Sequence, residues 1–238
     1  VIEPVFDKGK VTRYDSRKLN WIGSISPQSI ACFTRKDSPV KTLQDAMQKE
    51  AVMATTGGSI SAMTANVMNT LIGTKFKIVK GYPGGPDTLL AMQRGEIHGN
   101  GGLAWGSYKA DYRDVHERKQ VRILGAFGMR QHPELKDVPM FPTGKTEEER
   151  QLFQLMYARQ DFGRPFAVPE GVPLDRVLAL REAFAKTMKD PAFIAEAERA
   201  NTEVDPVTGE ELDALTQKLH ATPPAVVQRM QQIINAAK

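Results

Sequence analysis

The chain has 238 residues, of which 41% are hydrophobic and 25% charged, and its formal net charge is +4. This composition is typical of a globular protein with one large domain or two α/β lobes. No apolar run approaches the roughly 18 residues of a membrane-spanning helix. The cations lie among acidic neighbours, which argues against a nucleic-acid surface but leaves a weak preference for an anionic small molecule. The single cysteine, Cys32, excludes an intrachain disulfide and a thiolate metal site.

The first predicted elements are two short strands, at 21–26 and 29–35, with a Pro-Gln turn between them. A loop then leads into a helix within 38–50. Thr42 is the expected N-cap of this helix, because Asp45 follows three residues later in a variant of the capping box.

Strand patterns alternate with helical patterns between about residues 50 and 130. The strands are predicted at 51–56, 75–82, 96–99 and 121–128. Apolar residues at helical spacing follow the first of these strands, and Gly73 is the expected end of that helix. Because strands alternate with helices, the sequence predicts an α/β fold with mostly parallel sheets covered by helices.

The last third of the chain is predicted to be helical. Thr146 with Glu149, and Thr208 with Glu211, have the spacing of capping boxes. A long helix is predicted over 173–190, and the Asp-Pro pair that follows restarts a helix as its cap and first residue. The chain ends in an amphipathic helix.

Three glycine-containing segments each follow a predicted strand and precede a predicted helix. They are TTGGSIS at 55–61, GYPGGPD at 81–87 and GNGGLAW at 99–105. In an open parallel sheet such loops meet at the carboxyl ends of the strands, where ligands bind. The free N–H groups at a helix start favour an anion, and glycine lets the backbone come close to it. The alternative for any single loop is that its glycines only form a tight turn.

Other residues of these segments have two interpretations. Asp87 is better explained as a favourable charge at a helix N-terminus than as a ligand acceptor. The aromatic residues Tyr82 and Trp105 either form the wall of a pocket for an organic ligand or pack in the core. His98 flanks the third segment and is the histidine of most interest.

The sequence offers no nucleophile–base pair and no metal-ligand spacing. It lacks the phosphate-loop lysine, the GxGxxG fingerprint and the GxSxG nucleophile motif. Its four histidines are dispersed. Binding without turnover is therefore favoured, with no catalytic residue, metal or cofactor. The alternative is an α/β enzyme acting on a carboxylated or phosphorylated small molecule, with His98 or Asp87 as its base.

Several segments resemble one family when they are taken in order along the chain. They include SPVKTLQDA, ATTGGSIS, GTKFKIVKGYPGG and GRPFAVPEGVPLDRV. In this order they resemble the solute receptors of tripartite tricarboxylate transporters, the Bug family. The resemblance extends from about residue 12 to residue 238 and rests on the series, because each motif alone is unspecific.

The resemblance implies a two-lobed, type II-like periplasmic binding protein that closes on a small organic anion in the cleft between its lobes. It implies a periplasmic location and membrane transporter subunits as partners; no nucleic acid is expected, and the protein is expected to act as a monomer. A receptor that signals to a membrane sensor is the other alternative. The lobes are expected at 1–38 with 166–238, and at 39–165.

The resemblance also assigns ligand-binding positions. Matched by position, and with Trp105 added for its place in the third segment, they are Thr56, Gly57, Gly58, Ser59, Ser61, Tyr82, Pro83, Gly84, Gly85, Asn100, Gly101, Gly102 and Trp105. The sequence departs from the family in two respects. It begins downstream of the family's first strand and first ligand loop, so an incomplete first lobe is expected. The tryptophan in the third segment indicates a bulkier or aromatic ligand rather than a citrate-like one.

Overall fold

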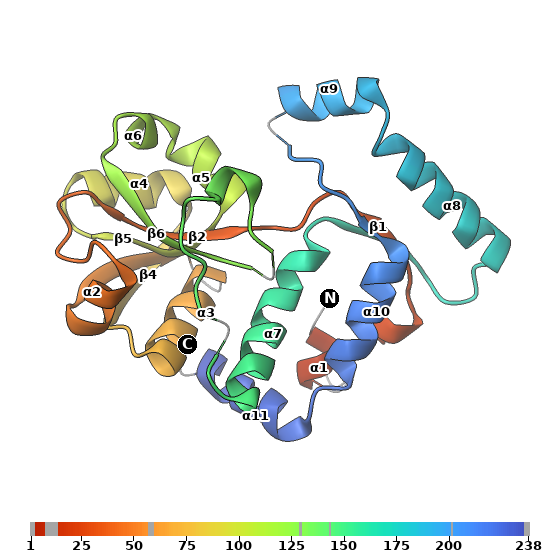
Figure 1. The fold of residues 1–238 in the computed structure, drawn as a ribbon, viewed down its shortest axis with the longest axis horizontal. Helices are drawn as coiled ribbons and strands as arrows, with labels where there is room; N and C mark the ends of the chain where they lie inside the picture. The colour runs from red at the N-terminus through yellow and green to blue at the C-terminus, as the bar shows by residue number, and fades with distance from the viewer. Residues whose placement is uncertain are drawn as a thin grey trace. The chain divides into compact units, whose positions relative to one another are not determined.

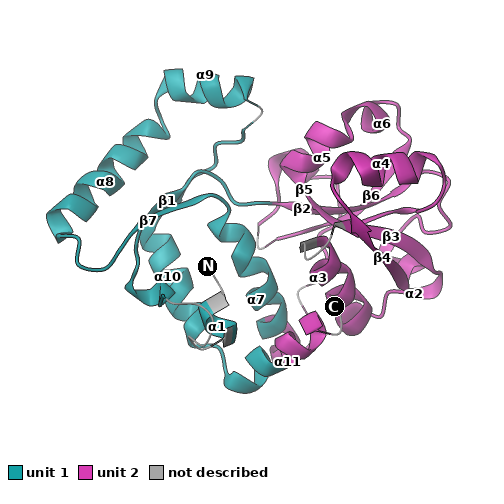
Figure 2. Ribbon diagram, turned by 180° about the vertical axis from the view of Figure 1, so that it is seen from behind, with its two compact units in different colours: residues 1–28, 151–228 teal, residues 29–150, 229–238 magenta. Residues whose placement is uncertain are grey.

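The computed structural model describes residues 3–7, 14–56, 60–128, 130–142, 144–200 and 202–235. The chain forms two compact units, which Figure 2 shows in different colours. Unit 1 comprises Val1–Gln28 and Gln151–Gln228, and unit 2 comprises Ser29–Arg150 and Arg229–Lys238. The lobes predicted at 1–38 with 166–238 and at 39–165 divide the chain at other residues and stay a prediction.

Unit 2 contains a five-stranded sheet with the order β4-β3-β5-β2-β6. Its strands are β2 (Ile30–Arg35), β3 (Ala51–Thr56), β4 (Phe76–Tyr82), β5 (Gly99–Ala104) and β6 (Val121–Phe127). The predicted parallel arrangement holds for β3, β4 and β5. Strand β2 is antiparallel to β5 and to β6, so the sheet is mixed and β6 runs in the same direction as β5.

Helices cover both faces of this sheet. Figure 1 shows α4, α5 and α6 on one side, and α2 and α3 on the other. The helices are α2 (Leu43–Gln48), α3 (Ile60–Val67), α4 (Gly85–Gln93), α5 (Trp105–Asp111) and α6 (Arg113–Glu117). A π-helical turn continues α3, and Gly73 ends it with a left-handed φ of 81°, as predicted. On the side of α4, α5 and α6, buried residues such as Phe33, Ala54 and Tyr108 form one apolar core.

Unit 1 is built around β1 (Asn20–Ser24), which pairs antiparallel with β7 (Pro165–Val168) and β8 (Val207–Thr208). The helices that contribute residues to it are α1 (Glu3–Asp7), α7 (Glu147–Phe162), α8 (Leu174–Thr187), α9 (Pro191–Arg199), α10 (Gly209–His220) and α11 (Pro224–Asn235). Helix α8 lies against β1, and the Arg181 Nε of this helix donates a hydrogen bond to the backbone oxygen of Trp21 at 2.8 Å. Strands β1 and β2 are neighbours in sequence, yet they belong to different sheets.

The predicted helix caps are confirmed. The Thr42 side chain accepts a hydrogen bond from the backbone of Asp45 at the start of α2. Thr208 and Glu211 form a reciprocal capping box at α10, in which each side chain accepts a hydrogen bond from the backbone N–H of the other residue. Asp190 caps α9. None of the described helices is long and apolar enough to cross a membrane.

Candidate ligand-binding site

The carboxyl ends of four strands share one edge of the unit 2 sheet. Strand β3 ends at Thr56, which pairs in register with Tyr82 at the end of β4. Ile30, at the start of the antiparallel strand β2, lies opposite both Ala104 at the end of β5 and Phe127 at the end of β6. This carboxyl-terminal edge is where an open α/β sheet offers helix N-termini to a ligand.

The first predicted segment follows β3 at this edge. Gly57, Gly58 and Ser59 lie outside the described residues, and helix α3 begins directly after them at Ile60. Ser61 is buried in the first turn of α3. This first turn contains no acidic residue. No carboxylate in the first turn of α3 therefore compensates the positive end of this helix dipole.

Thr55 is a site candidate that the sequence analysis missed. Its side chain is fully buried, and its Oγ1 has no hydrogen-bond partner among the described residues. Ala54 belongs to the core on the α4 side. Because successive strand residues point to opposite faces, Thr55 points toward the side of α3. A buried hydroxyl without a partner is uncommon, and here it lies one residue before the end of β3, the strand that precedes α3.

The second predicted segment reaches the same edge but already holds acidic side chains. Gly84 is the N-cap of α4 and Gly85 its first residue. A Cβ atom on Gly85 would collide with the Asp111 carboxylate, so that carboxylate lies against the helix start. Asp87 lies in the first turn of α4 itself, as its interpretation as a helix-start charge requires, and is the second carboxylate near this helix start. These charges compensate the α4 dipole and disfavour an anionic ligand there.

The third predicted segment requires a correction, because Asn100, Gly101 and Gly102 lie within strand β5 and not in a loop. A Cβ on Gly101 would be 2.7 Å from the Cβ of Ala65 in α3, and one on Gly102 would be 2.9 Å from the Cβ of Thr64. These glycines therefore let α3 pack closely on β5. The Asn100 side chain accepts a hydrogen bond from the Gly102 N–H at 2.9 Å.

Trp105 begins α5 and packs in the core. Only 7% of it is exposed. Its ring stacks on that of Tyr108 with centroids 4.9 Å apart, and Tyr108 stacks in turn on Tyr112. Burial raises the pKa of Tyr112 to about 12, so its hydroxyl stays protonated. The Trp105 Nε1 donates to the Glu134 carboxylate. Of the two interpretations of Trp105, packing is the one that these contacts support.

His98 lies at the opposite end of β5 from the carboxyl-terminal edge. Its Nδ1 accepts a hydrogen bond from the Val52 N–H at 2.9 Å, which ties the ring to the start of β3. Burial, together with the nearby charge of Arg35, lowers the pKa of His98. His98 therefore does not face the predicted ligand edge and is poorly placed as a base there. The described residues contain no cluster of three or more potential metal ligands.

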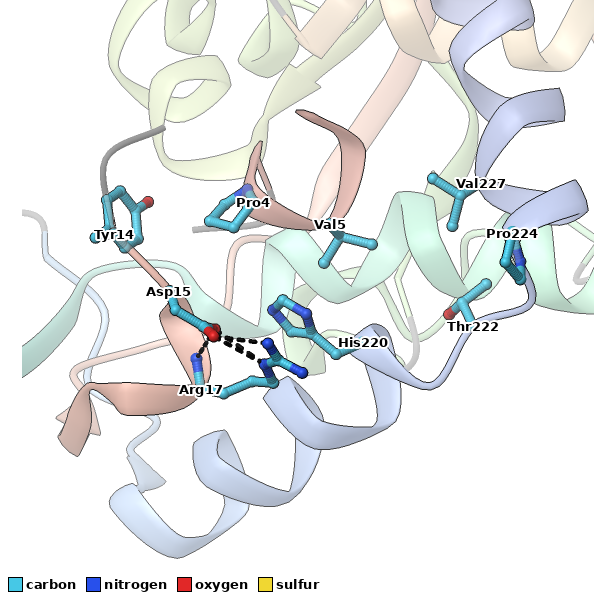
Figure 3. Close-up of a pocket in the computed structure, with 9 residues that line it drawn as sticks. All are labelled: Pro4, Val5, Tyr14, Asp15, Arg17, His220, Thr222, Pro224 and Val227. Atoms are coloured by element: carbon cyan, nitrogen blue, oxygen red, sulfur yellow. Dashed lines mark hydrogen bonds and ion pairs between the residues drawn. The ribbon is translucent and has the colours of Figure 1, made fainter. Parts of the chain in front are cut away.

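Unit 1 contains a separate cavity of about 340 Å³, shown in Figure 3. Arg17 in its wall is ion-paired with Asp15 at 2.7 Å. The hydrogen bond from Arg17 lowers the pKa of Asp15 to about 2. His220 also lines this cavity, and its Nε2 is 2.8 Å from the hydroxyl of the buried Ser16. Because Asp15 already neutralises Arg17, this cavity suits an organic anion less well than the start of α3.

Comparison with known proteins identifies the fold. No protein-family model matches the sequence, and no curated protein does. Among solved structures, a TctC solute-binding protein from Polaromonas has a TM-score of 0.69 at 18% identity, covering 98% of this chain and 75% of its own. The chain has the fold of the TctC solute-binding proteins. The predicted α/β binding-protein fold class is thereby confirmed.

Two further structures share the TctC fold. A protein from R. palustris solved with adipate has a TM-score of 0.57 at 16% identity, with 96% of this chain and 72% of that chain covered. MatC from Rhodopseudomonas palustris, solved with malate, has a TM-score of 0.55 at 15% identity, with 97% and 74% covered. Nearly all of this chain is therefore matched in each case, whereas about a quarter of each neighbour is not.

Proposed function

We propose that this chain is a solute-binding receptor that captures a small organic carboxylate without transforming it. The observation that carries the proposal is the TctC fold over 98% of the chain, together with a helix N-terminus at the carboxyl-terminal edge whose first turn has no acidic residue. The resemblance to receptors of tripartite transporters implies a periplasmic location and membrane transporter subunits as partners, and we extend both features to this protein.

In the proposed site the carboxylate lies at the start of α3. The backbone N–H groups of the segment Thr56 to Ser61 donate to it, and the dipole of α3 stabilises its charge. The hydroxyl of Thr55 supplies a further donor from β3. Hydrogen bonds to a charged group contribute roughly 1.5–3 kcal/mol each, so a few such donors account for binding without any cationic side chain.

The other predicted positions divide by location. Tyr82 and Pro83 lie at the same edge and remain proposed contacts to the body of the ligand. Gly84 and Gly85 start a helix that faces Asp111, so they are less suited to the carboxylate itself. The remaining predicted positions lie in β5 and at the start of α5. A ligand would have to extend to these elements to contact them: Asn100, Gly101, Gly102 and Trp105.

The test is a thermal unfolding series with three ligands. Adipate and malate are the first carboxylates to use, because structures of the same fold hold them. Adipamide is the matched control, since it keeps the length of adipate and removes both charges. A ligand at about one hundred times its Kd stabilises a protein by about 2.7 kcal/mol. We expect a carboxylate to raise the unfolding midpoint and adipamide to leave it unchanged.

Calorimetric titration then gives the stoichiometry, which we expect to be one carboxylate ligand per chain. If adipamide stabilised the chain as much as adipate, the site would not distinguish a charged ligand from a neutral one. The proposal of an anion site at the start of α3 would then be wrong. If a panel of mono-, di- and tricarboxylates produced no shift and no heat, the receptor proposal itself would have to be withdrawn.

A further inference from the structure

Unit 2 has a concave surface at the end of its sheet opposite the carboxyl-terminal edge. This basic groove has a volume of about 790 Å³ and is lined by Arg35, Lys36, Arg118 and Lys119, with Asp37 as its one carboxylate. Four cations against one carboxylate leave an excess of three positive charges. The groove is independent of the site proposed for the organic carboxylate.

The fold brings these cations together from separate parts of the chain. Arg35 ends β2 and pairs in register with Val121 at the start of β6. The next backbone N–H, that of Lys36, donates to the carbonyl oxygen of Gln120 at 2.7 Å. The Arg-Lys pair at the end of β2 and the Arg-Lys pair after α6 therefore meet, although each lies among acidic neighbours in the sequence.

Only one of the four cations has its charge compensated within the groove. The Arg35 Nε forms an ion pair with Asp37 at 2.9 Å, and its guanidinium also donates to the carbonyl oxygen of Met92 at 3.4 Å. The structure gives no ion pair to Lys36, Arg118 or Lys119 within the part of the chain that it describes, and all three are exposed. These three side chains can reach an incoming anion.

Lys119 has an unfavourable backbone conformation. Its φ is 54°, and among the described residues it is the one non-glycine residue with a positive φ. It follows the end of α6 at a position that is usually glycine, where the Gln120 N–H donates to the carbonyl oxygen of Val115 at 2.8 Å. A cation stabilises a helix C-terminus, but Arg118 already provides this cation for α6. The helix end therefore does not explain why a lysine occupies the strained position 119.

We propose that the basic groove docks an acidic segment of a protein partner. Its apolar lining residues, Met92 and Val115, are each only 4% exposed, so the groove offers charge rather than the apolar walls of a small-molecule pocket. Surfaces of this kind steer an oppositely charged partner and fix its orientation, and like charges brought opposite one another weaken binding strongly. An exposed run of Asp and Glu side chains fits this chemistry.

The probe for this proposal is a fluorescently labelled hexaglutamate peptide, with binding to the full chain followed by anisotropy. The variant Lys36→Glu with Lys119→Glu reverses two groove charges. The control, Lys75→Glu with Lys77→Glu, makes the same change in net charge at two exposed residues at the start of β4. We expect the groove variant to lose about ten-fold or more in affinity and the control to stay close to the unmodified chain.

A third variant, Lys119→Gly, separates charge from structural damage. It removes one cation and relieves the positive φ, so we expect weaker peptide binding together with a higher unfolding midpoint. Equal losses in the groove and control variants would show that only net charge matters and would overturn the proposal. Unchanged peptide binding by Lys119→Gly would also contradict it, as would equally tight binding of an oligothymidylate of the same charge.

Discussion

Thr55 places a hydroxyl in the interior of unit 2 where the described residues provide no partner for it. An unsatisfied buried polar group costs about 1–3 kcal/mol. A valine would fill the same space without this cost. The threonine is understandable if its hydroxyl is used when a ligand or a water molecule occupies the start of α3.

The variant Thr55→Val tests this directly. We expect adipate affinity to fall by roughly 10-fold or more, because a hydrogen bond to a charged group is lost, while the free energy of unfolding stays equal or rises. Thr34→Val is the matched control, since the Thr34 hydroxyl donates to the carbonyl oxygen of Val40 at 3.0 Å in the core. Thr34→Val should lower the free energy of unfolding and leave adipate affinity unchanged. If Thr55→Val lowered stability and left adipate affinity unchanged, Thr55 would not belong to the site.

His98 gives a prediction about pH. Burial lowers its pKa below the ordinary value of 6.5, so below pH 6.5 the unfolded chain takes up a proton that the folded chain resists. Stability is then lost as the pH falls through this range. In His98→Asn, whose side-chain oxygen can accept the Val52 N–H in place of Nδ1, we expect a smaller loss of unfolding free energy between pH 7 and pH 5.

His220 has a pKa lowered by burial as well, so some acid sensitivity should remain in His98→Asn. Chemical unfolding at several pH values measures both proteins. Identical slopes would mean that His98 titrates alike in the folded and unfolded chain.

The sequence reveals part of this residue-level picture. The glycine-serine pattern before α3 indicates an anion cradle, because the chemistry of a helix start is local. Thr55 could not be distinguished from Thr56 without knowing which face of β3 carries α3. The Asp111 carboxylate against Gly85 was equally invisible, since the two residues are far apart in sequence and meet only through packing.

At the scale of elements, the contact between α3 and β5 depends on glycine. Gly101→Ala would place a methyl group 2.7 Å from the Cβ of Ala65, so helix and strand would have to move apart. Overpacking of this kind costs typically 1–3 kcal/mol. We expect Gly101→Ala to lower the free energy of unfolding by about that amount, measured in urea.

Gly106→Ala provides the control. This glycine lies in α5 and has nothing within 4 Å of an added Cβ, so alanine should stabilise the helix by up to about 1 kcal/mol. Opposite signs for the two glycine variants are expected. A Gly101→Ala protein of unchanged stability that failed to bind adipate would instead return Gly101 to the ligand contacts.

The helix caps were predictable because a cap involves residues three apart. The extent of strand β5 was not: the sequence predicts a strand at 96–99, whereas β5 runs from Gly99 to Ala104, because Asn-Gly-Gly is a typical turn sequence. Here the close approach of α3 determines which side chains fit, and tertiary packing outweighs the local preference for a turn.

At the scale of the whole molecule, the alternation of strands and helices was enough to predict an α/β fold. The order of strands was not predictable, since the insertion of β2 between β5 and β6 depends on pairings over long sequence separations. The same pairings gather the cations of the basic groove, which the sequence presents as scattered charges. Unit 2 therefore offers an anion two places of different physical origin, the helix dipole at the start of α3 at one end and side-chain charges at the other.

The two ends can be separated by ionic strength. Strand β5 has six residues, which at about 3.3 Å each separates the two edges by roughly 20 Å. Charges screen each other over about 10 Å at 0.1 M salt but over about 30 Å at 0.01 M. The variant Lys36→Glu with Lys119→Glu should therefore slow adipate association at 0.01 M salt and match the unmodified chain at 0.1 M, as measured by stopped-flow mixing. If adipate binding were lost at both salt concentrations, the basic groove would itself be the carboxylate site, and the assignment to the start of α3 would be wrong.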